Sequence, residues 1–175
     1  MTSNKSPNPL LRIFPVLGIL VSLYALWVEH RKALDDTYEA LCDLSEGASC
    51  TKVLMSSYGH IFSHFGFVPN GSALDVPNPV LGLCFYSLVL LWPRNYSRLP
   101  VLVASLGSVL FSAYLGYILY AVLKDFCLVC VSSYIINFVI LVVEAFYTTS
   151  VSREGSGKGS SNVRGSRAPS SKQKL

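Results

Sequence analysis

The chain has 175 residues, of which 51% are hydrophobic and only 14% are charged, with a formal net charge of +4 at pH 7. The length predicts one domain, and the composition is too apolar for a soluble protein of this size. The positive charge does not require a nucleic-acid partner, because the positions of the basic residues explain it in another way, as shown below.

Four apolar runs cover residues 10–28, 80–92, 100–123 and 126–147. Runs of this kind predict transmembrane helices. The second run is the shortest, and we expect its helix to begin at Asn78 and Pro79. The first run resembles a secretory signal, but no small-residue cleavage site precedes its bulky end, so we expect it to stay as an anchor. The predicted fold class is therefore an all-α integral membrane protein, a bundle of four transmembrane helices with a large lumenal loop, or cap, between helices one and two.

Basic residues are distributed unevenly around these runs. They lie before or at the start of the first run, separate the second from the third and follow the fourth: Lys5 and Arg12; Arg94 and Arg98; and Arg153, Lys158, Arg164, Arg167, Lys172 and Lys174. The positive-inside rule places all three segments in the cytosol. This predicts a cytosolic N-terminus at residues 1–9, a membrane domain at residues 10–149 with a lumenal loop at about residues 30–77, and a disordered basic cytosolic tail at residues 150–175.

The lumenal loop begins with charged residues and helix formers at positions 31–41, which predict that the first helix continues out of the membrane and ends near Cys42. Cys42 and Cys50 enclose a turn-rich segment that can bring the two sulfurs together. In an oxidising lumen this pair is either a permanent structural disulfide or one half of a redox relay.

The rest of the loop, residues 58–69, is rich in aromatic residues and glycine and predicts a cap against the membrane surface. His60 and His64 have helical spacing, but we interpret them as polar rim groups, and we expect no metal. Asn78, at the mouth of the second helix, either satisfies backbone groups or points into the bundle as a donor. Cys84, alone in that helix, is expected to pack. In the third helix a small-residue packing face is predicted at Ser105, Ser108, Ser112 and Gly116.

A Cys-x-x-Cys pair, Cys127 and Cys130, stands at the head of the fourth apolar run. Helical spacing puts both cysteines on one face with Tyr134 and Asn137. The start of a helix favours thiolate, because unpaired amides and the helix dipole stabilise negative charge there. Two other readings exist: each cysteine is a small buried hydrophobe, or the pair binds zinc, for which the sequence offers no further ligands nearby.

The cysteines and their neighbours form an ordered series: Leu-Cys-Asp at 41–43, Cys50, Asn78 ahead of Gly82 and Phe-Tyr at 85–86, then Leu-Lys-Asp-Phe-Cys-Leu-Val-Cys at 123–130, and Tyr134. Over roughly residues 15–145 this series resembles the vitamin K epoxide reductase family of animal type. The segment at 56–63, Ser-Ser-Tyr-Gly-His-Ile-Phe-Ser, departs from the arginine- and tryptophan-containing pattern of that family.

The resemblance implies roles for individual residues. Cys130 would be the catalytic thiol that attacks the substrate, and Cys127 would resolve the adduct. Cys42 and Cys50 would be the electron shuttle, with Cys50 passing electrons to Cys127. The substrate-binding residues would be Asn78 and Tyr134, which would hydrogen-bond the two quinone oxygens, together with Phe85.

The implied activity is reduction of vitamin K 2,3-epoxide to the quinone, and of the quinone to the hydroquinone, in the endoplasmic reticulum membrane, with both termini cytosolic and the active site lumenal. It would need no permanently bound cofactor and no metal. The expected partners are vitamin K quinone or epoxide, lumenal thioredoxin-like dithiol donors, the lipid bilayer and coumarin-type inhibitors, and no nucleic acid. The alternative functions are a quinone-dependent thiol oxidase that makes disulfides in lumenal proteins, and a non-enzymatic membrane protein held by structural disulfides.

Overall fold

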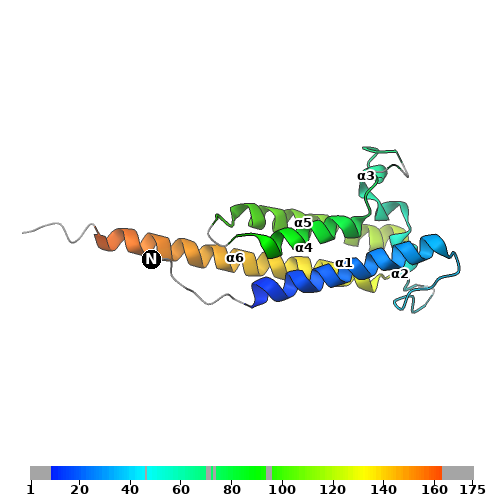
Figure 1. Ribbon diagram of the computed structural model, residues 1–175, viewed down its shortest axis with the longest axis horizontal. Coiled ribbons are helices and arrows are strands. Elements are labelled where there is room, and N and C mark those ends of the chain that lie inside the picture. The colour runs from blue at the N-terminus through cyan, green and yellow to red at the C-terminus, as the bar shows by residue number, and fades with distance from the viewer. Residues whose placement is uncertain (1–8, 46, 70–71, 73, 94–95, 163–175) are drawn as a thin grey trace, which may run out of the picture.

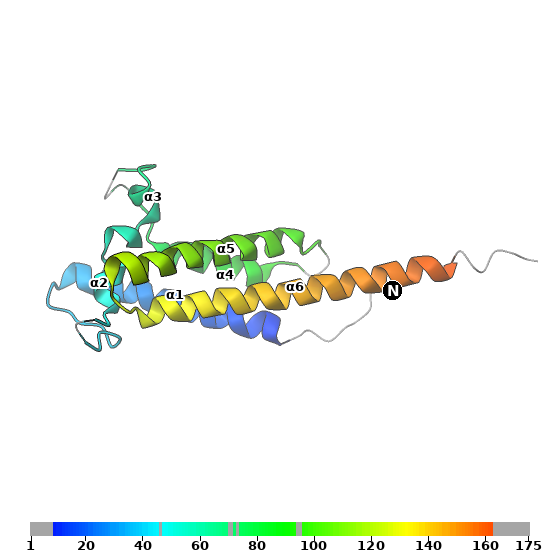
Figure 2. The same cartoon turned by 180° about the vertical axis from the view of Figure 1, so that it is seen from behind.

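Four apolar helices lie side by side along the long axis of the molecule (Figures 1 and 2). The computed structural model describes residues 9–162 except 46, 70–71, 73 and 94–95. The four helices are α1 (Leu10–Leu34), α4 (Asn78–Leu91), α5 (Leu99–Tyr117) and α6 (Leu128–Asn162), and a π-helical stretch, η2 (Ile118–Leu123), continues α5. α1 packs on α4 and α6, and α5 packs on α6. The described part of the chain contains one isolated β-bridge and no strand.

Three of these helical segments are long and apolar enough to cross a membrane: Leu11–Leu34, Leu99–Leu123 and Leu128–Ser150. The other apolar helix, α4, has 14 residues and is shorter than a usual span. It begins at Asn78, as predicted, and Pro79 occupies its first turn, where a missing N–H costs no intrahelical hydrogen bond. The prediction of an all-α protein with apolar, membrane-compatible helices is thus confirmed.

The first helix ends earlier than the sequence predicted. α1 stops at Leu34, and the expected helical continuation to residue 41 is wrong. The cause is local: Asp35 Oδ1 accepts hydrogen bonds from the backbone amide and the hydroxyl of Thr37, at 2.9 and 2.6 Å. Such a turn gives the backbone an alternative to the next helical hydrogen bonds, so the chain leaves the helix there.

The last helix ends later than expected. α6 continues through Asn162, so the boundary predicted at residue 150 is not the end of the helix. No proline interrupts this segment before Pro169. Residues 1–8 and 163–175 lie outside the described residues.

Small residues allow the helices to approach one another closely. A Cβ atom on Gly18 of α1 would lie 2.5 Å from the ring of Tyr86 in α4, a side chain that is itself 1% exposed. On α5, Ser105 and Ser112 are buried, and a Cβ on Gly116 would touch Tyr134 of α6 at 3.7 Å. The predicted small-residue face therefore is a packing face, and it meets α6.

The loop between α1 and α4 forms short elements at one end of the bundle (Figures 1 and 2). They are α2 (Cys50–Leu54), the 3-10 helix η1 (Ser57–Gly59) and α3 (Ile61–His64). The side chain of Ser49 caps α2 by accepting from the amide of Lys52 at 3.2 Å. At the same end, Lys124 adopts a left-handed conformation (φ 52°), which ends η2 and leads the chain into α6.

Candidate active site

The two cysteines of the Cys-x-x-Cys pair stand at the start of α6, as predicted. Cys127 immediately precedes the helix and Cys130 lies in its first turn. The backbone amide of Cys130 donates to Cys127 Sγ at 3.2 Å. A hydrogen bond with the Cys130 thiol, aided by backbone amides, lowers the pKa of Cys127 below its ordinary value even though the residue is buried. Both thiols are free.

A disulfide joins the other pair, Cys42 and Cys50, and both residues are buried. Cys42, Cys50 and Cys127 belong to one hydrophobic cluster, against which Cys130 packs. The fold therefore brings the two cysteine pairs together from the loop and from α6. This neighbourhood is what thiol–disulfide exchange between the pairs requires.

Asp43 fixes the conformation of the disulfide loop. Its carboxylate accepts from the backbone amides of Ala40 and Thr51, at 2.8 and 3.0 Å, and from the hydroxyls of Ser49 and Thr51. Partial burial opposes ionisation, but these hydrogen bonds outweigh it and lower the pKa of Asp43 to about 2. The carboxylate is therefore ionised at neutral pH and holds both sides of the loop.

A cavity of about 500 Å³ lies between the helices beneath the short loop elements. We call residues 57–64, which comprise η1 and α3, the roof. Tyr58, Gly59, Ile61 and Phe62 of the roof line the cavity. Most of the remaining wall is apolar and comes from all four long helices, so the cavity has the volume and the character of a site for an apolar small molecule.

Of the predicted site residues, Cys130, Asn78, Phe85 and Tyr134 all border this cavity. Asn137, which the sequence placed on the same face of α6, borders it too and donates to Ser112 Oγ of α5 at 2.8 Å. The structure thus brings together residues from α4 and α6. Of the Cys-x-x-Cys pair, Cys130 borders the cavity, whereas Cys127 is buried in the hydrophobic cluster.

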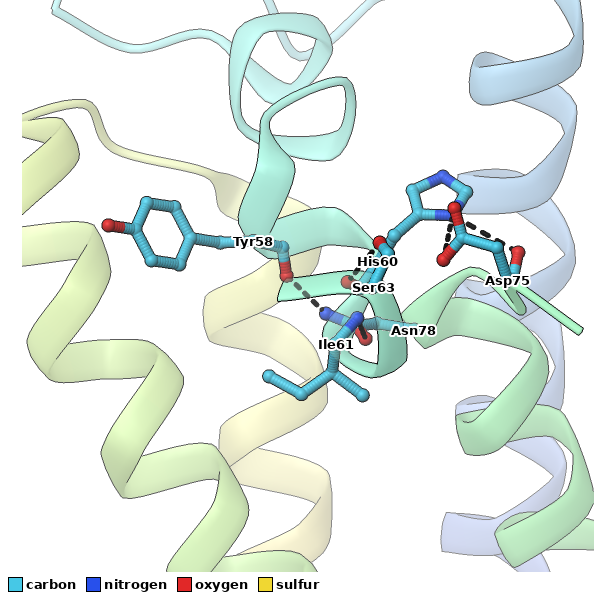
Figure 3. Close-up of polar contacts among 6 residues, drawn as sticks. All are labelled: Tyr58, His60, Ile61, Ser63, Asp75 and Asn78. Carbon is cyan, nitrogen blue, oxygen red and sulfur yellow. Dashed lines mark hydrogen bonds and ion pairs between the residues drawn. The ribbon is translucent and has the colours of Figure 1, made fainter. Parts of the chain in front are cut away.

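The Asn78 side chain is hydrogen-bonded to the roof (Figure 3). Its Nδ2 donates to the carbonyl oxygen of Tyr58 at 2.7 Å, and its Oδ1 accepts from the amide of Ile61 at 3.3 Å. Of the two alternatives that the sequence left open, the amide therefore satisfies backbone groups. An asparagine amide has two N–H donors, so one remains for a ligand while the roof is held.

His60 and His64 turn to different neighbours. His60 Nδ1 lies 3.2 Å from the carbonyl oxygen of Asp75, and the ring of His64 packs on Tyr58 with centroids 4.4 Å apart.

Cys84 is exposed on α4, so the expectation that it packs is wrong.

Sequence reasoning missed three buried charged residues. Glu29 in α1 is 9% exposed, and Glu144 in α6 is fully buried. Arg98, which the sequence assigned to a cytosolic loop, is buried as well and forms an ion pair with Glu144 at 3.0 Å. The available signal was the presence of single acids within or beside apolar runs, because such residues need a specific partner or role inside a membrane.

The fold and the site together define a class of protein: a helical oxidoreductase whose apolar helices suit a membrane. The family comparison agrees. The chain belongs to the vitamin K epoxide reductase family, whose model matches residues 9–145.

Two relatives illustrate the similarity. The chain is 37% identical over 143 residues to "Vitamin K epoxide reductase complex subunit 1" of Mus musculus, an alignment that covers 78% of this chain and 87% of the mouse protein. It is 36% identical over 140 residues to the protein of the same name from Rattus norvegicus, with the same coverage of both chains.

Proposed function

We propose that the chain reduces vitamin K 2,3-epoxide to the quinone, and the quinone to the hydroquinone, with electrons from protein dithiols. We further propose that it does so in the endoplasmic reticulum membrane, with four membrane-crossing helices, cytosolic termini and a lumenal active site. The observation that carries the proposal is the position of Cys130: it borders an apolar cavity, has Cys127 next to it, and packs against the hydrophobic cluster that contains the second cysteine pair. Family membership supports the choice of substrate.

The reaction begins with Cys130, because it is the α6 thiol that a cavity ligand can reach. Its sulfur attacks a ring carbon of the quinone or epoxide, and the proton of the Cys130 thiol passes to the substrate oxygen as a C–S bond forms. Cys127 then attacks the sulfur of Cys130 and gives its own proton to the product, so that an S–S bond forms, the C–S bond breaks and its electron pair stays on the product. The dithiol is oxidised by two electrons, and with the epoxide the oxygen leaves as water.

Negative charge develops on the substrate oxygen during the attack, and two cavity donors are suited to stabilise it. The Asn78 amide has a free N–H after binding the roof, and the Tyr134 hydroxyl comes from the same helix as the dithiol, one turn beyond Cys130. Donors fixed in place before the reaction stabilise such charge effectively. Phe85 provides aromatic surface for the naphthoquinone ring.

The Cys42–Cys50 pair would restore the active site. In the reduced state, its thiolate would attack the Cys127–Cys130 disulfide and become a disulfide itself, which is the state of that pair in the structure. A thioredoxin-like dithiol on the lumenal side would then reduce it again. This cycle needs no permanently bound cofactor, and the cavity that takes vitamin K is also the place where coumarin-type inhibitors would bind.

The test is dithiol-driven turnover of vitamin K epoxide in microsomes that contain equal amounts of the wild-type chain or of Cys130→Ala. We expect product with the wild-type chain and none with the variant. No turnover by either, under conditions in which a known reductase is active, would refute the proposal. Quinone-dependent oxidation of reduced lumenal proteins in the same membranes would then identify a thiol oxidase.

A further inference from the structure

Two contacts hold the roof of the cavity, one to the first residue of α4 and one to the segment before it (Figure 3). One is the Asn78 amide, which holds the backbone of Tyr58 and Ile61. The other is His60, which lies between those two residues in the chain. Its Nδ1 is 3.2 Å from the carbonyl oxygen and 3.4 Å from the carboxylate Oδ1 of Asp75.

The chemistry of this second contact defines its direction. A carbonyl oxygen can only accept a hydrogen bond, so the hydrogen bond to Asp75 requires the proton on Nδ1 of His60. The nearby carboxylate favours the same arrangement, because its negative charge attracts the N–H group or a charged imidazolium. The Asp75 side chain is 8% exposed, so water screens the interaction only weakly.

The two contacts form a closed clip. Asp75 and Asn78, three residues apart in the sequence, form one side of the clip. Tyr58, His60 and Ile61 form the other side. Neither His60 nor Asp75 is among the residues that line the cavity, whereas Tyr58, Ile61 and Asn78 are. His60 therefore acts on the cavity only through the residues on either side of it and through the segment that carries Asn78.

We propose that His60, through Asp75, is a positioning residue: it holds the roof closed over the cavity and keeps Asn78 in place to bind substrate. The claim that Asn78 meets a substrate oxygen rests on the function proposed above, whereas the closure of the roof over Cys130 does not. Loss of the clip weakens substrate binding, because the roof forms part of the cavity wall, and it exposes Cys130 to reagents from solution. It leaves the thiol chemistry itself largely intact.

The experiment compares His60→Ala, His60→Asn and His30→Ala with the wild-type chain. The asparagine amide places an N–H donor close to the position of Nδ1, so it keeps the bond to Asp75. His30 is an exposed histidine of α1, away from the roof, and serves as the matched control. All four proteins are first compared by thermal unfolding in detergent without ligand.

Two readouts follow. The first is KM and kcat for vitamin K epoxide: we expect His60→Ala to raise KM about tenfold, the usual effect of losing one hydrogen bond, and to change kcat less than threefold. The second needs no substrate: the rate at which N-ethylmaleimide alkylates Cys130, followed by peptide mass spectrometry, should rise about tenfold. His60→Asn should restore both values to within about threefold, and His30→Ala should change neither.

The two readouts separate the two proposals. If the wild-type chain does not turn over the epoxide, the proposed function fails. The alkylation rate of Cys130 then tests by itself whether His60 holds the roof closed. Unchanged alkylation and unchanged KM in His60→Ala, or failure of His60→Asn to restore them, would overturn the clip. If His60→Ala does not fold, His60→Phe, which keeps an aromatic ring of similar size but removes the Nδ1 donor and so both contacts with Asp75, takes its place. It must then raise both the alkylation rate and KM, and unchanged values overturn the proposal.

Discussion

The buried ion pair where α5 begins leads to a quantitative prediction. Arg98 Nη1 and Glu144 Oε1 are 3.0 Å apart, with side-chain exposures of 8% and 1%, and the guanidinium also lies 5.4 Å from the centre of the Tyr147 ring. The pair joins α5 to α6. Removal of either partner leaves the other charge buried and without its counter-ion.

The geometry sets the size of the effect. At 3.0 Å and an effective dielectric constant of about 20, the attraction is roughly 5 kcal/mol. The cost of removing two charges from water offsets most of it, so the pair adds little net stability over an apolar pair of similar volume. Removing one partner is different, because the desolvation of the remaining charge is then uncompensated, and the expected loss is about 3–5 kcal/mol.

The assay is a double-mutant cycle with Arg98→Met, Glu144→Leu and the double variant, measured as reversible unfolding in mixed detergent. We expect each single variant to lose about 3–5 kcal/mol of unfolding free energy, and the double variant to recover most of this loss. Single losses below about 1 kcal/mol that simply add in the double variant would refute the reasoning, since the two charges would then be solvated independently.

Three further predictions concern other parts of the chain. Gly18→Ala should destabilise the bundle by about 1–3 kcal/mol, because the new methyl group overlaps the buried ring of Tyr86. Gly107→Ala is the control and should not destabilise it, because nothing lies within 4 Å of the new methyl group. Thermal unfolding of the two variants tests this difference. The depressed pKa of Asp43, about 2, adds about 1 kcal/mol of stability after a discount for the exposure of this side chain to solvent; it is fully present above pH 4 and is lost as pH falls through 2. A stability curve from pH 2 to 6 should show this slope in the wild-type chain, and its persistence in Asp43→Asn would contradict the assignment. Asn78→Ala should lower epoxide turnover by about two to three orders of magnitude, and turnover within tenfold of wild type would exclude the amide as a donor to the substrate.

The sequence predicted the features that depend on local pattern. Apolar runs located the helices, and the proline after Asn78 marked the start of α4. Three-and-four spacing from Cys130 correctly placed Tyr134 and Asn137 on the cavity face of α6. These predictions are correct because each one depends only on residues that are close together in the sequence.

Contacts between distant segments could not be predicted in this way. Glu144 is 46 residues from Arg98, and no periodicity in either helix relates them. The bonds from Asn78 to the roof span 17 and 20 residues, and they depend on how the loop folds back over the bundle. The end of α1 was missed for a smaller reason: the turn at Asp35 competes with helix propensity, and residues 31–41 read as helix when propensity alone is considered.

The central claim is that Cys130 and Cys127 together deliver two electrons to a quinone or epoxide in the cavity. The most direct test is a single turnover by the Cys42→Ala, Cys50→Ala double variant, reduced with dithiothreitol, freed of the reductant and mixed with vitamin K epoxide. Our account predicts up to one equivalent of quinone per protein, matched by one Cys127–Cys130 disulfide in the peptide mass spectrum, and no further product. Quinone formed without that disulfide, or formed equally when Cys130 is also replaced, would contradict it.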